Sequence, residues 1–309
     1  RALRRRLEAF DVERFFEQEL EPHLAELEAL RKRTLSTYAL ALVLGVPAVC
    51  MLFVASVSPS VGTPIIFLGA AGLCAAIIAL LCAGSIRSRF KKLFKCRVIG
   101  SLIAARHPTF KYDPDKRIAP EVYCASRLFP RSYDSYAGDD LIVGKLGQTD
   151  FSFSELHTQY VTTTTDGKGN RRQEWRTIFQ GIFFSADFHK HFVGATFVLP
   201  DLAESLLGTW LGQGLQSLTS VHGEIVKLED PDFEKAFVTF SSDQQEARYI
   251  LSPAMMERML KLQRRLKARV HFGFVGERVY VAISTGKTHF EPRLMQDATS
   301  LAQIRDYLY

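Results

Sequence analysis

The stretch FVASVSPSVGTPIIFLG, residues 53–69, interrupts a long apolar segment of the chain. Two prolines and a glycine fall between Ser58 and Pro64, and such a sequence ends a helix because proline lacks a backbone donor and clashes with the preceding turn. No charged residue occurs from Thr34 to Ile86, so the interruption leaves two apolar halves, 37–57 and 61–86. At a rise of about 1.5 Å per residue, each half spans roughly the 30 Å of a bilayer's hydrocarbon or more. The stretch therefore predicts the tip of a hairpin of two transmembrane helices.

Basic residues flank this hairpin on one side only. Arg31, Lys32 and Arg33 precede the first predicted helix, and the loop between the helices carries no charge. Positive residues stay on the cytoplasmic side of a membrane, so we expect both ends of the chain inside and only the turn outside. A signal peptide is the alternative, but it has one apolar region of about 7–15 residues. Six basic residues after the second helix are candidates for contact with the membrane surface: Arg87, Arg89, Lys91, Lys92, Lys95 and Arg97.

The net charge of +6 is concentrated beside the hairpin. Residues 87–117 hold ten basic and two acidic side chains, whereas residues 118–309 hold 21 basic and 23 acidic ones. A basic cluster next to a membrane helix attracts anionic headgroups. The chain is therefore expected to contact anionic lipids, and nucleic acid is not an expected partner.

Small residues recur every four positions in the second predicted helix, at Ala71, Ala75, Ala79 and Ala83. This spacing lets another helix approach closely. The partner is either the first helix of the same hairpin or a helix of another chain. The second alternative predicts a homo-oligomer or a complex with another membrane protein.

The chain divides into four predicted regions. Residues 1–36 form an amphipathic cytoplasmic helix that Pro22 kinks, and residues 37–86 form the transmembrane hairpin. Residues 87–111 form a basic juxtamembrane helix or stalk that ends before His107-Pro108, and residues 112–309 form a cytoplasmic domain.

The cytoplasmic domain reads as α+β, with antiparallel strands and packed helices. Two β-rich runs, 151–165 and 171–188, surround the turn DGKGN and predict a hairpin, and a second hairpin is predicted around Gly276. Other predictions are turns at 113–115 and 136–139, strands at 191–199 and 233–240, and helices that begin after Asp201 and Ser252. A pleckstrin-homology-like barrel is one fold compatible with this order.

Four segments of the chain resemble a bacterial family known as domain of unknown function 3137: GKLGQTDFSFSELH (144–157), TTTTDGKGNRR (162–172), TIFQGIFFSADFHKHFVGATFVLPD (177–201) and FVTFSSDQQEARYILSP (237–253). The resemblance implies a bacterial inner-membrane protein with a cytoplasmic domain. It supplies no catalytic residues and no activity. It also implies a genomic association with small membrane-anchored helical proteins of the LemA type, which are therefore candidate partners.

Motifs of known chemistry are absent from the sequence. There is no phosphate-binding loop, dinucleotide-binding turn, zinc-protease motif or nucleophile elbow, and no pair of cysteines has metal-ligand spacing. A metal site needs His157, His189 and His191 to converge, and surface histidines are the simpler interpretation. Acidic residues around Pro231, and Trp210 in LLGTWLGQGL, are likewise interpreted as a solvated turn and a half-buried helix.

Three classes of function follow. The favoured class is a non-enzymatic, membrane-anchored interaction or scaffold protein, because every strong signal concerns anchoring. The alternative is a lipid- or ligand-binding module held against the membrane, and the least favoured is an enzyme of unrecognised type. We accordingly assign no catalytic, cofactor-binding or metal-binding residue.

Overall fold

The computed structural model describes residues 20–57, 63–165, 167, 171–200, 219, 221–292 and 294. The chain forms two compact units. Unit 1 comprises residues 1–107 and 290–309, and unit 2 comprises residues 108–289. The expected N-terminal helix before residue 20, the loop 58–62 and the helix expected after Asp201 lie largely or wholly outside the described residues.

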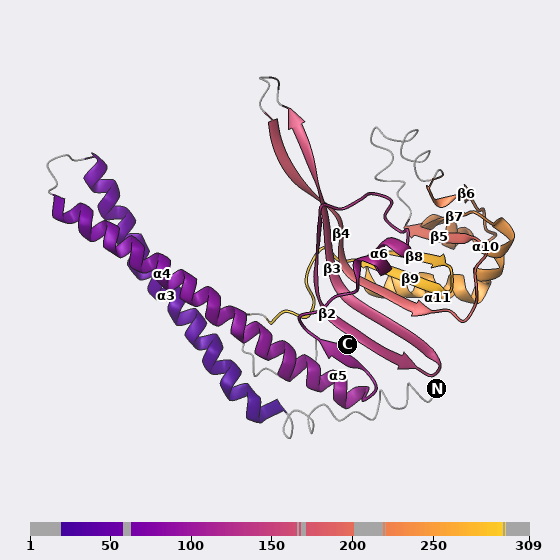
Figure 1. Cartoon of the computed structure of the whole chain (residues 1–309), viewed down its shortest axis with the longest axis horizontal. Helices are drawn as coiled ribbons and strands as arrows, with labels where there is room; N and C mark the ends of the chain where they lie inside the picture. Colours follow the sequence, from indigo (N-terminus) through magenta and orange to yellow (C-terminus); the bar gives the residue numbers. More distant parts are fainter. Residues whose placement is uncertain are drawn as a thin grey trace. The chain divides into compact units, whose positions relative to one another are not determined.

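Unit 1 is built on two long antiparallel helices (Figure 1). The first ends at Val57 and the second begins at Thr63, as the proline- and glycine-containing interruption predicts. The second helix continues through a π-helical turn and ends at Arg106. The bounds are α3 (Glu21–Val57), α4 (Thr63–Phe94), η2 (Lys95–Ile99) and α5 (Gly100–Arg106).

Unit 2 contains one antiparallel sheet, with nine strands among the described residues. This confirms the α+β fold class. The strands are β1 (Lys111–Asp113), β2 (Ser135–Leu146), β3 (Thr149–Thr165), β4 (Arg171–Asp187), β5 (Ala195–Pro200), β6 (Glu224–Ile225), β7 (Phe237–Ser241), β8 (Arg269–Val275) and β9 (Arg278–Ser284).

The order of strands across the sheet is β1-β2-β3-β4-β9-β8-β5-β7-β6. Both predicted hairpins, β3–β4 and β8–β9, are present. The β8–β9 hairpin lies between β4 and β5, so it joins the first four strands to the other three. Over the described residues β1 and β6 end the sheet without pairing to each other, so the sheet is open and the barrel alternative is wrong.

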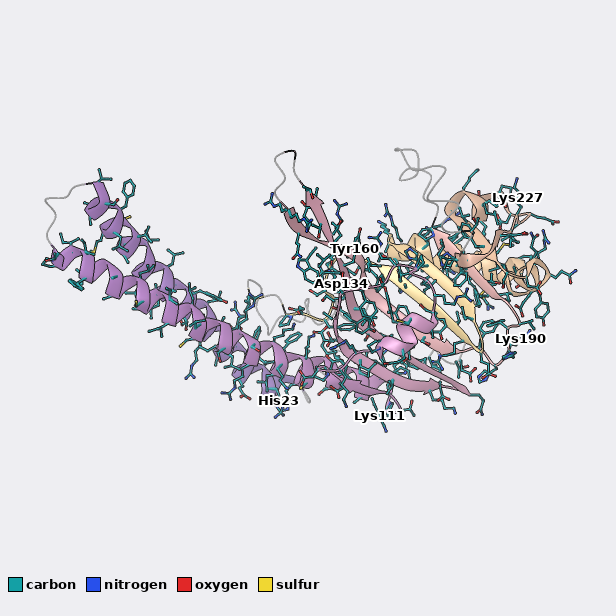
Figure 2. All side chains as sticks on the ribbon, turned by 45° about the horizontal axis from the view of Figure 1, so that its top comes forward. His23, Lys111, Asp134, Tyr160, Lys190 and Lys227 are labelled. Carbon is teal, nitrogen blue, oxygen red and sulfur yellow. The ribbon has the colours of Figure 1, made fainter. Side chains whose placement is uncertain are left out.

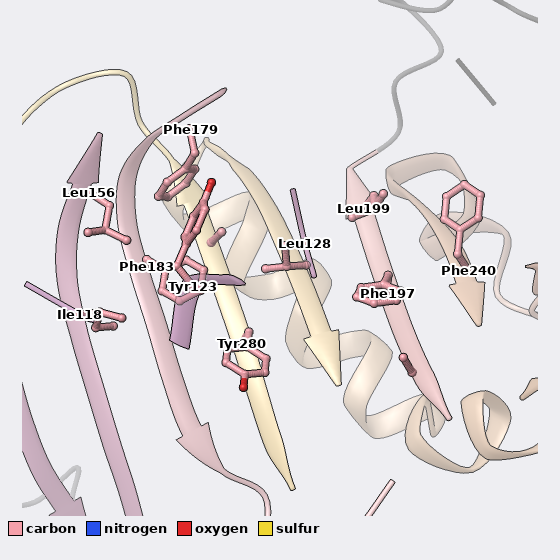
Figure 3. Close-up of a cluster of buried hydrophobic side chains, with 12 residues drawn as sticks. Ile118, Tyr123, Leu128, Leu156, Phe179, Phe183, Phe197, Leu199, Phe240 and Tyr280 are labelled. Atoms are coloured by element: carbon pink, nitrogen blue, oxygen red, sulfur yellow. The ribbon is translucent and has the colours of Figure 1, made fainter. Parts of the chain in front are cut away.

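Buried side chains cover both faces of the sheet. Because neighbouring residues of a strand point to opposite faces, Phe197 and Leu199 of β5 join one core while Val198 joins the other. The first core includes Tyr123 of α6 (Pro120–Ala125) and the sheet residues Phe179, Phe183 and Tyr280 (Figure 3). The second core packs the sheet against α9 (Pro231–Ala236), α10 (Gln244–Ile250) and α11 (Pro253–Leu266).

The predicted strand at 233–240 is wrong in its first half. Residues up to Ala236 form α9, and only the residues from Phe237 form a strand. Asp230 caps α9, because its Oδ1 accepts hydrogen bonds from the backbone N–H groups of Asp232 and Phe233. Proline at the first helical position adds to this start signal.

The predicted turn at 136–139 is also wrong, because these residues lie inside β2. The register of β2 against β3 shifts between Asp139 and Ile142, and Asp140 has a φ of +61°. The residues therefore form a β-bulge, which uses turn-like residues within a strand. At Gly138 a Cβ atom would lie 2.3 Å from the carbonyl oxygen of Glu155, so the glycine serves a close approach of two strands.

Candidate functional site

The outer surface of the α3–α4 hairpin carries a band of exposed apolar side chains. On α3 the exposed large apolar residues lie between Leu40 and Val57, and on α4 between Ile65 and Leu81. Each stretch spans about 25 Å along its helix. Only 11% and 17% of the most apolar part of each helix is buried, unlike the core helix of a globular unit. Both helices are therefore long and apolar enough to cross a membrane (Figure 2).

Polar side chains next to this band have local hydrogen-bond partners. The hydroxyls of Thr37 and Ser56 donate to the carbonyl oxygens of Arg33 and Phe53, at 2.7 Å each. Such bonds satisfy a hydroxyl without help from water. The surface of the hairpin can therefore lie against an apolar medium at these two positions without leaving a hydroxyl donor unsatisfied.

The pattern inverts beyond the band. On the second helix Phe90, Phe94, Val98 and Leu102 are buried, and on the first helix leucines are buried in the same way, at Leu20, Leu24, Leu27 and Leu30. The exposed positions between them include the charged residues Glu26, Lys92 and Arg97. This is the pattern of a water-exposed amphipathic helix pair.

The six predicted membrane-contact residues divide into three groups. Arg87, Arg89 and Lys92 are exposed, as a surface contact requires. Lys91 forms an ion pair with Glu291, and an Arg97 Nη1 lies 3.2 Å from His23 Nε2.

Lys95 does not fit the expected surface role. It is 2% exposed and begins η2. A π-helical turn contains one residue more than the regular helix allows, which rotates the following positions toward another face. We therefore withdraw Lys95 as a membrane contact.

The predicted small-residue stripe is shared between two faces of α4. Ala79 and Ala83 are buried, Ala75 is half-buried and Ala71 is exposed. The close packing against α3 instead centres on glycines. A Cβ at Gly72 would lie 3.0 Å from the Cβ of Ala48, and one at Gly69 would lie 3.0 Å from Leu52. Glycine and alanine at these positions bring the two backbones together.

The three histidines considered for a metal do not form a cluster. His157 Nε2 lies 3.2 Å from Thr177 Oγ1, and His189 Nε2 lies 3.1 Å from Thr149 Oγ1. His191 pairs with Glu277 instead. Residues 188–194 form a loop before β5, so the expected strand at 191–199 begins late and the two histidines do not share a strand face.

An acidic cluster in unit 2 was missed by the sequence analysis. Oxygen atoms of Asp139, Asp140 and Glu155 all lie within 4.8 Å of one another at the bulge of β2. Tyr112 donates a hydrogen bond of 2.5 Å to Asp140, and the backbone N–H of His289 donates one of 2.5 Å to Glu155. These bonds tie the bulge to β1 and to the end of unit 2. Asp139 and Glu155 are cross-strand partners, a pairing that only the register of two strands reveals.

A cavity of about 360 Å³ lies between α9 and α11. It includes two of the acidic residues predicted near Pro231, and Glu234 of that group accepts a hydrogen bond of 2.7 Å from the Leu228 N–H. The lining residues are Asp230, Asp232, Glu257, Leu260, Lys261 and Arg264. Acidic and basic side chains both line the cavity, as is common between two helices that are exposed to solvent.

Groups with shifted pKa values lie elsewhere. Burial lowers the pKa of His271 to about 4, with a weaker opposing effect from its contact with the Ala282 carbonyl oxygen. Burial also raises the pKa of Tyr123, whose hydroxyl lies 3.0 Å from Thr158 Oγ1. Neither residue lines the cavity between α9 and α11. Both are parts of the packed sheet.

Comparisons with known proteins give one family and one structural likeness. Residues 177–309 match the family model described as "Protein of unknown function (DUF3137)". No curated protein sequence matches the chain significantly. A solved structure, "crystal structure of the mycobacterial trehalose monomycolate transport factor A, TtfA", aligns over 66% of this chain and 88% of that chain, with 9% identity and a TM-score of 0.30.

Proposed function

We propose that this chain, which through residues 177–309 belongs to the family of unknown function DUF3137, is a membrane-anchored interaction protein without enzymatic activity. In this proposal α3 and α4 cross a bacterial inner membrane, and unit 2 presents its sheet and helices to partners in the cytoplasm. The observation that carries the proposal is the apolar band. Its height of about 25 Å is similar on both helices and close to the thickness of a bilayer's hydrocarbon.

The charges on either side of the band support the orientation. Arg33 and Lys32 precede the band on α3, and Arg87 and Arg89 follow it on α4. The connecting residues 58–62 carry no charge. Because positive residues stay on the cytoplasmic side, both termini lie in the cytoplasm.

The outward side of α4 supports an interaction within the membrane. Ala71 is exposed, and glycine–alanine packing already occupies the side toward α3. The partner is a second copy of this chain or a small helical membrane protein, for which LemA-type proteins are candidates. A helix that packs on Ala71 would use the same tight van der Waals contact that holds the hairpin.

The topology is tested by labelling cysteines in whole bacteria. In a chain whose five native cysteines are replaced by alanine, Ser60→Cys is expected to react with a membrane-impermeant maleimide in intact cells. Lys168→Cys is expected to react only after the cells are permeabilised, because unit 2 is inside. Labelling of Lys168→Cys in intact cells would overturn the orientation, and extraction of the chain from membranes by alkaline carbonate would overturn the anchor.

A further inference from the structure

The β3–β4 hairpin extends far beyond the rest of the sheet (Figure 1). Strand β2 pairs with β3 only as far as Gln159, and β9 pairs with β4 only from Gly181. Beyond these points six consecutive pairs, from Tyr160–Arg176 to Thr165–Arg171, join β3 to β4 alone. We call residues 160–165 and 171–176 the distal ribbon.

The base of the distal ribbon is held firmly. Asp134 Oδ2 accepts a hydrogen bond of 2.7 Å from the backbone N–H of Val161. The guanidinium of Arg131 lies 4.0 Å from the centre of the Tyr160 ring, as a cation–π contact. These contacts fix the direction in which the ribbon leaves the sheet.

Each face of the distal ribbon has a net charge of +1, from Arg171 on one face and from Arg172, Arg176 and Glu174 on the other, but the faces differ in their apolar and acidic residues. Residues that pair directly share a face, so Val161 and Trp175 lie on one face with Arg171. The other residues of this face, Thr163, Thr165 and Gln173, are uncharged. Glu174 lies on the opposite face and pairs with Arg176 at 3.5 Å. The Trp175 face therefore has a tryptophan, a cation and no carboxylate.

The Trp175 face is exposed as well. Trp175 is 57% exposed, and all residues from Arg171 to Thr177 are exposed. A two-stranded ribbon is only marginally stable in water, so a surface that covers one of its faces would stabilise it. Tryptophan and arginine together are the residues that settle at the headgroup level of a membrane.

We propose that the Trp175 face of the distal ribbon docks flat on an anionic phospholipid surface. The proposal rests on the proposed function, because the helical anchor keeps unit 2 at high effective concentration near the membrane. Arg171 meets the phosphate groups, Trp175 enters the headgroup layer, and the threonine hydroxyls bond to lipid oxygens. The ribbon then acts as a second, charge-dependent contact that holds unit 2 against the inner leaflet.

The test uses the fluorescence of Trp175 in the full chain, with Trp210→Phe so that one tryptophan remains. The chain is reconstituted into vesicles of phosphatidylcholine, with or without phosphatidylglycerol, and a fraction of the lipid carries brominated acyl chains. Quenching by bromine is expected only when phosphatidylglycerol is present, and added salt is expected to weaken it. Equal quenching in both lipids, or none in either, overturns the proposal.

Two neighbouring arginines give a matched pair of variants. Arg171→Thr is expected to weaken the lipid contact about fivefold, since one basic residue near an anionic surface contributes that much. Arg172→Thr removes the same charge from the opposite face and is expected to have a smaller effect. Threonine suits a strand, so both variants keep the ribbon. Equal losses in the two variants overturn the choice of face.

Failure of the anchor and failure of the ribbon give different results. If the hairpin does not insert, the chain does not float with vesicles of either composition. If only the ribbon proposal is wrong, the chain floats but bromine does not quench Trp175. Protection of Trp175 from acrylamide in native membranes, without quenching in anionic vesicles, would assign the face to a protein and overturn the lipid contact.

Discussion

At the scale of single residues, His271 makes the stability of unit 2 depend on pH. Its pKa is about 4 in the folded chain and about 6.5 when unfolded, so the unfolded chain binds the proton first. The contribution of His271 to the free energy of unfolding is therefore fully present above pH 6.5. It falls by about 3 kcal/mol as the pH drops toward 4. Denaturant titrations of the full chain in detergent, followed by tryptophan fluorescence, measure this loss.

His271→Phe is the control for this prediction. It is expected to flatten the pH dependence between pH 6.5 and 4, whatever it does to the stability at neutral pH. His107 and His289 also have lowered pKa values and account for the slope that remains. An unchanged slope in His271→Phe would show that the other groups carry the whole effect.

Residue by residue, the sequence predicted exposure better than it predicted contact. Arg87, Arg89 and Lys92 are exposed as expected, because charge next to a helix end avoids burial. Lys95 is buried at the start of η2, and no residue pattern announces such a turn. The proximity of Asp139 to Glu155 depends on strand register, which residue composition does not fix.

At the scale of elements, Gly72 and Ala71 lie on different faces of α4: Gly72 packs against α3, and Ala71 is exposed. Gly72→Leu is expected to destabilise the hairpin by about 2 kcal/mol, because the added side chain meets Ala48 and pushes α3 away. Ala71→Leu also introduces a leucine, but at an exposed position, and should leave the hairpin intact. Far-UV circular dichroism during heating in detergent compares the two variants.

The same pair of variants tests association between chains. If a helix of another chain packs on the outward side of α4, Ala71→Leu lowers chemical crosslinking of the full chain in native membranes. Parental crosslinking in Ala71→Leu would confine the small-residue packing to the hairpin itself.

Element boundaries were predictable where residues impose them sterically. Helix α3 ends at Val57, two residues before Pro59, and helix α11 begins at Pro253. The start of α9 was missed although Asp230 and Pro231 form a regular cap, because the phenylalanines at 233, 237 and 240 fit a strand and a helix equally well. The pairing with strand β5 begins only at Phe237, and it decides between the strand and the helix.

At the scale of the whole molecule, both described cores belong to unit 2. Among the residues that the structure describes, every buried member of these cores lies between Ile118 and Ala282. A fragment of residues 108–289 is therefore expected to fold in solution and to unfold cooperatively in denaturant. A fragment of residues 108–268, which lacks β8 and β9, is expected to show no cooperative transition, and cooperative unfolding of that shorter fragment would contradict the prediction.

The presence of two long apolar helices and a β-rich unit was predictable from charge and apolar patterns alone. An uncharged segment of about fifty residues with a proline- and glycine-containing break predicts a helical hairpin, and alternation of apolar and polar residues predicts strands. The strand order was beyond reach, because β5 pairs with β8 across about 70 residues and nothing local encodes that partner. Long-range pairing is settled by which faces can be buried together.

The central position of β8 and β9 also sets a timetable for synthesis. The ribosome makes α3 and α4 before the sheet and the β8–β9 hairpin after the other described strands, so the sheet stays in two halves until β8 and β9 are made. Until the hairpin arrives, β4 and β5 each have an unpaired edge, which is a template for wrong pairing between neighbouring chains. A chaperone that shields these two edges until β8 and β9 are made would thus be expected to reduce wrong pairing between neighbouring nascent chains.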